Sequence, residues 1–141
     1  MTTIAWDGTT LVTDSMQSCG GRICGKAKKI FFGNGFVYAG CGAFQDIQAV
    51  FNWLDDPANN EKPLVNEGFA ALVITTGVAE ELNDSLILFE SVVPNFMGSG
   101  ADIAAGAYDV CNDIKKAVET ACKLSTCSSL PLQIYSVLED A

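Results

Sequence analysis

The sequence predicts an α+β fold of antiparallel strands covered by helices. Short apolar runs are joined by tight turns such as Asp7-Gly8 and Gly33-Asn34-Gly35, and turns this short connect antiparallel neighbours. Other segments carry apolar residues at helical spacing, and such helices must bury that face against a sheet. Two architectures satisfy this pattern: two sheets between two helical layers, or one sheet with helices on one side.

The first third of the chain is predicted to be β-structure. Asp7-Gly8 and Gly33-Asn34-Gly35 each fit the turn of a hairpin. The four strands expected around these turns are Thr3–Trp6, Leu11–Thr13, Ile30–Phe32 and Phe36–Gly40. Between the two hairpins we expect only a glycine-containing turn, over Ser18–Gly21.

The rest of the chain alternates helices and strands. Apolar residues at helical spacing predict helices over Ala43–Leu54, Ala101–Val110 and Asn112–Lys123. Apolar or alternating runs predict strands over Phe69–Thr75, Leu86–Phe89, Val92–Val93 and Leu132–Leu138. Residues 57–67 are expected to form a polar loop, and the acidic tail from Glu139 is expected to be exposed.

Composition limits the class of protein. A chain of 141 residues fits a single domain over residues 1–141, and its 49% hydrophobic content implies either a large core or apolar surface covered by oligomerisation. A net charge of −9 argues against nucleic-acid binding, which needs a basic surface. No apolar run is long enough to span a membrane, and no signal peptide is evident. These features predict a cytoplasmic protein.

The side chains available for chemistry are restricted, because the chain has no histidine. Ser-His-Asp and Cys-His catalysis and histidine-containing zinc sites are therefore excluded. The six cysteines are expected to be free, small apolar residues in a reducing compartment. Cys122 and Cys127 have no second pair at metal-ligand spacing, so we expect no metal site.

Thr2 is the most complete candidate nucleophile. Removal of Met1 would make it N-terminal, with its hydroxyl beside its own α-amine. That amine has an ordinary pKa of about 8 and can accept a proton at cellular pH. The alternative is that Thr2 is merely an ordinary second residue. Lys28 and Lys29 would point to opposite faces if extended, and a buried lysine needs a carboxylate, for which Asp14 is the nearest candidate.

Three further residues each have a structural and a functional interpretation. Asp14 could be a turn residue at the end of a strand. Gly40 could simply allow the chain to pass from strand to helix. Ser99 could be the N-cap of the helix that begins at Ala101. The residues alone leave these alternatives open.

Considered together and in order, five motifs resemble the N-terminal-nucleophile hydrolases of the proteasome β-subunit type. The resemblance is greatest to the HslV peptidases and their short phage- or prophage-borne relatives. The motifs are Thr2-Thr3-Ile4, Thr13-Asp14-Ser15, Gly25-x-x-Lys28-Lys29-Ile30, Ala39-Gly40 and Gly98-Ser99-Gly100. The resemblance implies a four-layer αββα sandwich with antiparallel sheets.

The same resemblance implies a role for each site residue. Thr2 would supply the nucleophilic hydroxyl and the basic amine. Lys29 would favour loss of the hydroxyl proton through its positive charge, and Asp14 would orient Lys29. The backbone N–H of Gly40 would stabilise the oxyanion, and Ser99 would help to relay the proton.

The implied activity is that of a threonine-type endopeptidase that acts on peptides or unfolded proteins within a homo-oligomer and needs no cofactor. An ATP-dependent unfoldase is a candidate partner. One departure is that residues 55–68 are too few for the second long helix of HslV-type subunits, which leaves ring size and unfoldase docking open. Two alternatives are a catalytically inactive subunit and an amidase for non-peptide substrates on the same fold.

Overall fold

The computed structural model describes residues 2–19, 22–125 and 128–137. The chain forms two compact units. The first unit contains the residues up to Ile30 and those from Val92 onward, and the second contains Phe31–Ser91. We describe each unit separately. The expectation of a single domain over residues 1–141 stays a prediction.

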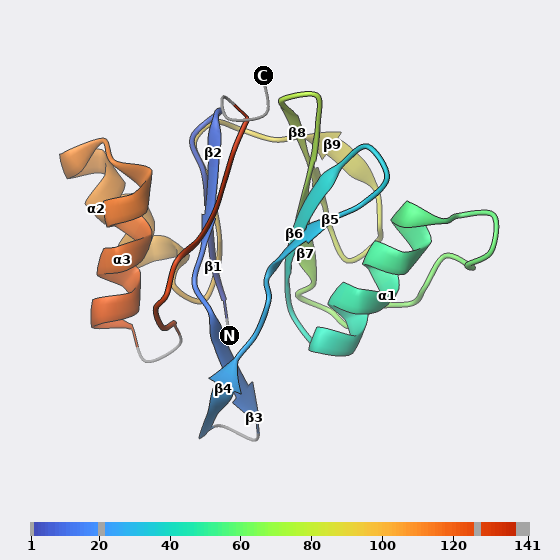
Figure 1. Cartoon of the computed structure of the whole chain (residues 1–141), viewed down its shortest axis with the longest axis horizontal. Coiled ribbons are helices and arrows are strands. Elements are labelled where there is room, and N and C mark those ends of the chain that lie inside the picture. Colours follow the sequence, from blue (N-terminus) through green and yellow to red (C-terminus); the bar gives the residue numbers. More distant parts are fainter. Residues whose placement is uncertain (1, 20–21, 126–127, 138–141) are drawn as a thin grey trace. The chain divides into compact units, whose positions relative to one another are not determined.

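The first unit is built on a four-stranded antiparallel sheet with the strand order β10-β1-β2-β11. Its strands are β1 (Thr3–Trp6), β2 (Thr10–Thr13), β10 (Asn95–Gly98) and β11 (Gln133–Ser136). Two helices, α2 (Ala101–Cys111) and α3 (Ile114–Leu124), cover one face of this sheet (Figure 1). The side chains buried between sheet and helices are Ala5, Val12, Ile114 and Val118.

The hairpin of β1 and β2 has a local chemical cause. The Asp7 carboxylate accepts hydrogen bonds from the backbone N–H groups of Thr9 at 2.9 Å and Thr10 at 2.8 Å, which closes an Asx turn. Gly8 has φ +103°, a conformation that glycine adopts without strain. The turn sets the register in which Ile4 lies opposite Thr13, so that the next residues, Thr3 and Asp14, also meet.

A two-stranded ribbon follows, formed by β3 (Met16–Cys19) and β4 (Arg22–Lys26). Our expectation of a turn alone over Ser18–Gly21 was incomplete, because Ser18 and Cys19 belong to β3 and β4 begins at Arg22. Gly20 and Gly21 themselves lie outside the described residues. The ribbon returns the chain to its starting point, where the Ala27 N–H donates to the Ser15 carbonyl at 2.9 Å.

The second unit is a five-stranded sheet with the strand order β5-β6-β7-β8-β9. Its strands are β5 (Ile30–Phe32), β6 (Val37–Cys41), β7 (Ala70–Thr75), β8 (Val78–Leu82) and β9 (Leu88–Glu90). Helix α1 (Phe44–Asp55) packs on it through Ile47 and Val50. The Tyr38 hydroxyl donates to the Ile47 carbonyl at 2.9 Å, and burial raises the Tyr38 pKa far above its ordinary value. Tyr38 therefore stays neutral and joins β6 to α1.

Most of the predicted elements agree with the observed ones, with exceptions beyond the β3–β4 ribbon. Each of the three helices begins and ends within two residues of the predicted positions, and no helix forms in the loop before β7. The prediction of a strand over Val92–Val93 was wrong, because the chain forms a bend there and pairs again only at β10. The sequence reading also missed β8 and β10. Part of the expected last strand, Leu138, and the acidic tail lie outside the described residues.

Gly98 ends β10 in a position that only glycine can occupy without displacement. It has φ +90°, and a Cβ atom placed there would meet the backbone of Thr2, at 1.9 Å from the carbonyl oxygen. Gly98 pairs with Thr3 in the register between β1 and β10. Its missing side chain therefore lets β10 lie directly against the start of β1.

We predict that Gly98→Ala lowers the free energy of unfolding by at least about 2 kcal/mol, because it adds both backbone strain and a clash with main-chain atoms. Gly106→Ala is the matched control. Gly106 lies within α2 with nothing near its Cβ position, so the same change should raise stability by about 0.5–1 kcal/mol. Urea denaturation of the two variants measures both effects. Equal effects in the two variants would contradict the steric argument.

Candidate active site

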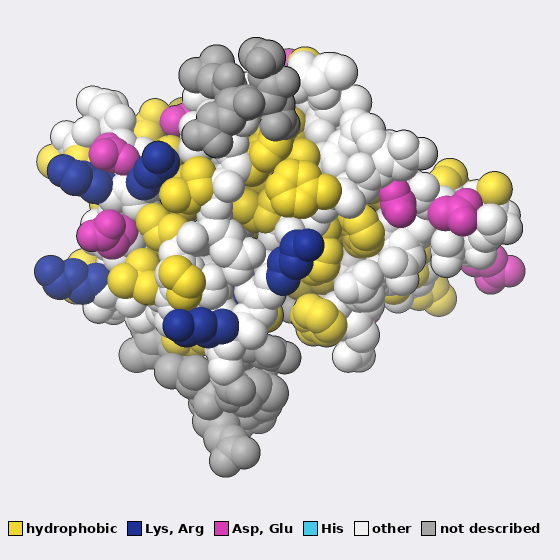
Figure 2. Space-filling model, in the orientation of Figure 1, with side chains coloured by type: hydrophobic (Ala, Val, Ile, Leu, Met, Phe, Trp, Pro, Cys, Tyr) yellow, Lys and Arg dark blue, Asp and Glu magenta, His cyan; other side chains and the backbone are white. Residues whose placement is uncertain are grey.

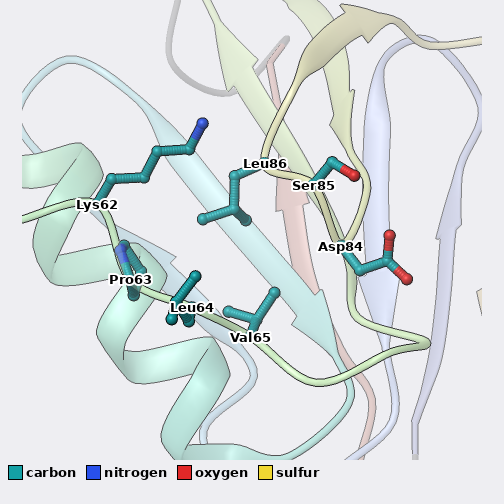
Figure 3. Close-up of a pocket in the computed structure, with 7 residues that line it drawn as sticks. All are labelled: Lys62, Pro63, Leu64, Val65, Asp84, Ser85 and Leu86. Atoms are coloured by element: carbon teal, nitrogen blue, oxygen red, sulfur yellow. The ribbon is translucent and has the colours of Figure 1, made fainter.

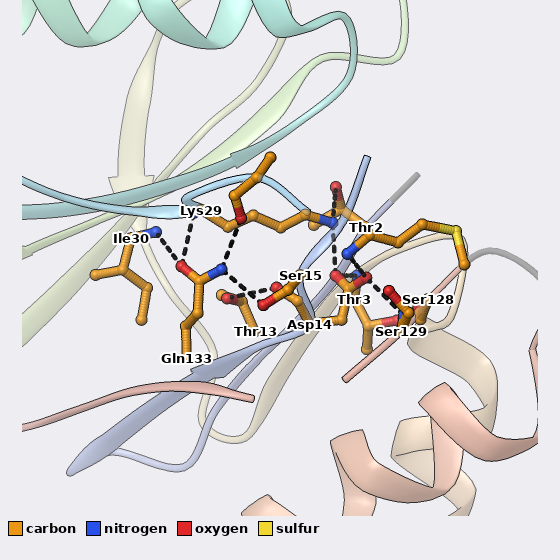
Figure 4. Close-up of polar contacts among 12 residues, drawn as sticks. Thr2, Thr3, Thr13, Asp14, Ser15, Lys29, Ile30, Ser128, Ser129 and Gln133 are labelled. Atoms are coloured by element: carbon orange, nitrogen blue, oxygen red, sulfur yellow. Dashed lines mark hydrogen bonds and ion pairs between the residues drawn. The ribbon is translucent and has the colours of Figure 1, made fainter. Parts of the chain in front are cut away.

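Asp14 lies at the centre of the polar cluster at the end of β2 (Figure 4). Its carboxylate is fully buried and accepts four hydrogen bonds. One oxygen accepts from the Lys29 ammonium at 2.7 Å and the Thr3 N–H at 3.0 Å; the other accepts from the N–H groups of Met16 at 3.0 Å and Ser129 at 3.1 Å. A carboxylate offers about four acceptor positions, so this one is saturated.

Lys29 projects into the same cluster from the segment between β4 and β5. Its Nζ lies 2.7 Å from Asp14 Oδ1 and 3.2 Å from the Thr2 hydroxyl oxygen. Only 7% of Lys29 is exposed, whereas its neighbour Lys28 is exposed. This is the alternation that the sequence predicts for two adjacent lysines in extended chain. The ammonium thus brings a positive charge to the Thr2 hydroxyl in surroundings that exclude most water.

Thr2 immediately precedes β1 and is 7% exposed. Its position follows from the sheet, because β1 is an inner strand held by β10 on one side and β2 on the other. Met1 lies outside the described residues, so whether it has been removed stays a question for experiment. The structure thus brings three of the predicted site residues together: Thr2, Asp14 and Lys29.

The other two predicted site residues, Ser99 and Gly40, lie on other segments of the chain. Ser99 lies in the turn between β10 and α2, one residue beyond Gly98, and its side chain is exposed. It is not the N-cap of α2, which is Gly100, and it makes no hydrogen bond to Thr2. Gly40 lies on β6 in the second unit. The proton-relay role of Ser99 and the oxyanion role of Gly40 both stay predictions.

Sequence reasoning missed a second hydroxyl pair beside Thr2. The Thr3 side chain hydrogen-bonds to the Ser128 hydroxyl, and both residues are buried. A Cβ atom on Gly100 would meet the Thr3 Oγ1 at 2.0 Å, so this glycine makes room for the pair. Thr3 and Ser128 are separated by 125 residues. No local pattern could have revealed their contact.

Gln133 is another residue that sequence reasoning missed. It is half-buried on β11, opposite Thr13 of β2, and its side-chain amide reaches Ser15 and the segment from Ala27 to Ile30. Within an alternating strand it has the spacing of an ordinary outward-facing residue. Only the pairing of β11 with β2 shows that it borders the cluster.

Other candidate chemistry is weaker. Burial, together with the charge of Asp14, raises the Cys122 pKa to about 11 despite the opposing effect of Lys29. The Cys122 thiol is therefore neutral at neutral pH and is no rival nucleophile. Among the described residues, no cluster of Cys, Asp and Glu side chains is arranged to hold a metal ion. Cys127, the other half of the C-x4-C pattern, lies outside them. No helix in the described ranges is long and apolar enough to cross a membrane.

A pocket of about 310 Å³ lies in the second unit (Figure 3). Its polar lining includes Lys62, Asp84 and Ser85. Asp84 already accepts the Gly68 N–H at 3.2 Å, which joins two loops. On the face shown in Figure 2, the lysine side chains of the described residues are scattered and form no continuous basic patch. Neither feature competes with the Thr2 cluster as a site of chemistry.

We predict that Asp14→Asn lowers the free energy of unfolding by about 3 kcal/mol, because it leaves the buried Lys29 charge without its partner. Adding Lys29→Met should recover part of this loss by removing that charge. Asp84→Asn is the control, since it changes an exposed carboxylate with one backbone partner and should cost less than about 1 kcal/mol. Denaturant titrations of the four proteins check this, and a double variant less stable than Asp14→Asn would contradict it.

Comparisons with known proteins support the fold. No protein-family model matches the sequence, and no curated protein matches it. Solved structures do match. Thiobacillus denitrificans BPH in complex with epoxomicin is 14% identical with a TM-score of 0.67, over 95% of this chain and 96% of that one. A second BPH structure is 16% identical with a TM-score of 0.63, over 95% of each chain.

The eukaryotic HslV of Trypanosoma brucei is similar to the same degree, at 15% identity and a TM-score of 0.67 over 94% of this chain and 97% of that one. These likenesses extend over nearly the whole of each chain, although few residues are identical. They confirm the predicted fold class, antiparallel sheets with helical layers. The chain therefore has an HslV-like fold.

Proposed function

We propose that this chain is a threonine-type peptidase whose nucleophile is the hydroxyl of Thr2, made N-terminal by removal of Met1. The observation that carries the proposal is the line of contacts from Asp14 through Lys29 to the Thr2 hydroxyl, at 2.7 and 3.2 Å. The HslV-like fold supports it, because the motifs of this sequence also resemble those of the HslV peptidases. Neither argument alone would be enough.

The base in this proposal is the α-amine of Thr2. A threonine hydroxyl is a weak nucleophile until a nearby group accepts its proton. Lys29 is poorly suited to that task, because its ion pair with Asp14 favours the charged ammonium form. Its charge instead stabilises the negative charge that develops on the Thr2 oxygen. The free amine, on the same residue as the hydroxyl, can accept the proton directly or through one water.

The reaction would then proceed by acyl transfer. Thr2 Oγ1 attacks the substrate carbonyl, and its proton passes to the α-amine. Backbone N–H groups, among which we predict that of Gly40, stabilise the resulting oxyanion. The C–N bond breaks as the leaving amine takes the proton, which leaves an ester on Thr2. Water, deprotonated by the same α-amine, hydrolyses this ester and restores the enzyme.

The proposed substrates are peptides or unfolded proteins, and the proposed working form is a homo-oligomer in the cytoplasm. A positive charge beside an amide-cleaving nucleophile does not by itself select peptides. An amidase for small molecules would use the same residues. An ATP-dependent unfoldase stays a candidate partner only.

The test uses two forms of the protein, one that keeps Met1 and one that begins at Thr2 after cleavage of an N-terminal fusion. We predict that the form beginning at Thr2 gains one covalent adduct from a peptide β-lactone and cleaves fluorogenic peptides. The Met1 form should do neither, because it lacks the free amine. Intact-mass spectrometry before and after incubation, with peptide mapping, measures the adduct and its site.

Matched variants give the controls. Thr2→Ala should form no adduct, whereas Thr9→Ala changes an exposed threonine and should react normally. Lys29→Met should slow acylation by about a hundredfold or more, because the developing charge loses its stabiliser. Lys28→Met, at the adjacent exposed lysine, should have an effect of no more than about twofold. Failure of the form beginning at Thr2 to react would leave the inactive-subunit alternative.

A further inference from the structure

Gln133 uses all the hydrogen-bonding capacity of its side chain on two segments of the first unit. Its Oε1 accepts from the backbone N–H groups of Lys29 at 2.7 Å and Ile30 at 3.4 Å. Its Nε2 donates to the Ala27 carbonyl at 2.7 Å and to the Ser15 hydroxyl at 2.9 Å. A glutamine amide has two donor protons and an acceptor oxygen with two lone pairs, so all four positions are occupied.

The orientation of this amide is determined by its neighbours. The Lys29 backbone N–H can only donate, and the Ala27 carbonyl can only accept. A reversed amide would place a donor against a donor and an oxygen against an oxygen. The Ser15 hydroxyl fits the same orientation, because it donates its own proton to the Pro131 carbonyl at 2.6 Å and is free to accept from Gln133.

The segment that Gln133 holds lies outside regular secondary structure. Residues 27–29 belong to no helix or strand, and they link β4 to β5. The Ala27 N–H bonds to the Ser15 carbonyl, but the Lys29 N–H bonds to Gln133. The position of the Lys29 backbone limits where the Nζ atom of its side chain can lie. Gln133 therefore acts at the base of the side chain whose tip lies 3.2 Å from the Thr2 hydroxyl.

We propose that Gln133 is a positioning residue for catalysis: its amide clamps the Ala27–Ile30 segment so that the Lys29 ammonium is held between Asp14 and Thr2. This inference rests on the proposed peptidase function for its catalytic meaning, but the clamp itself is independent of activity. Gln133 does not touch the nucleophile. Its substitution should therefore change the rate of the covalent step rather than the binding of the reagent.

The experiment compares Gln133→Met, which keeps the length but loses all four hydrogen bonds, with Gln133→Glu. The glutamate keeps an acceptor for the Lys29 N–H but places a carboxylate oxygen against the Ala27 carbonyl. Both should lower the maximal rate of Thr2 acylation by a peptide β-lactone by at least about tenfold, with the half-saturating concentration unchanged. Gln45→Met, at an exposed glutamine of α1, should stay within about twofold.

A second measurement does not depend on activity. The buried ion pair should slow proton exchange of the Lys29 ammonium, which gives a ¹H–¹⁵N signal that is assigned by its loss in Lys29→Arg. We expect this signal to be lost or shifted in both Gln133 variants, while the backbone amide spectrum of the second unit is unchanged. If Gln133→Met fails to fold, the same measurements on Gln133→Glu, which retains part of the network, test the proposed clamp.

The outcomes separate the two proposals. An unchanged ammonium signal in a folded Gln133 variant, together with acylation within about twofold of the unsubstituted protein, would overturn the clamp. If the unsubstituted protein is never acylated but the signal depends on Gln133, the peptidase proposal fails and the clamp stands. Equal losses of rate in Gln45→Met and Gln133→Met would also overturn it, because the effect would then not be specific to this network.

Discussion

The buried ion pair between Asp14 and Lys29 is the interaction on which the candidate site depends. Placing two charges away from water is costly, and the cost is offset only when each charge finds good partners. Asp14 has four, and through them it links the start of β1, the start of β3, the Ser129 loop and the Lys29 segment. One fully buried carboxylate thus organises four parts of the chain around the Thr2 hydroxyl.

The sheet and the glycines give that cluster its rigidity. Thr2 immediately precedes β1, an inner strand whose backbone is paired on both sides, and this pairing fixes the position of Thr2. Gly98 and Gly100 lie where any side chain would strike Thr2 or Thr3. Groups held by rigid elements and backed by further hydrogen bonds keep the geometry that catalysis needs. The Thr3–Ser128 pair and Gln133 supply such hydrogen bonds.

Sequence patterns anticipated most of the secondary structure because it is locally determined. Helical spacing located α1, α2 and α3, and the Asp7-Gly8 turn located the first hairpin, where the Asp7 side chain closes the turn itself. Strand β8 was not predicted because its sequence, Val-Ala-Glu-Glu-Leu, lacks clean alternation. Pairing with β7 and β9 makes it a strand despite this weak propensity. The β3–β4 ribbon was not predicted either, and its pairing contains a register shift between Gln17 and Ser18.

The sequence by itself determined the fold class, the absence of histidine chemistry, the nucleophile candidate Thr2 and the alternation that buries Lys29 while exposing Lys28. Only the tertiary structure decided which groups complete the cluster. Ser128, Ser129 and Gln133 lie more than 100 residues from their partners, and the pairing of β11 with β2 brings that stretch of chain beside Asp14 and Ser15. The physical reason is that strand register, unlike strand propensity, depends on which distant segments bury their surfaces together.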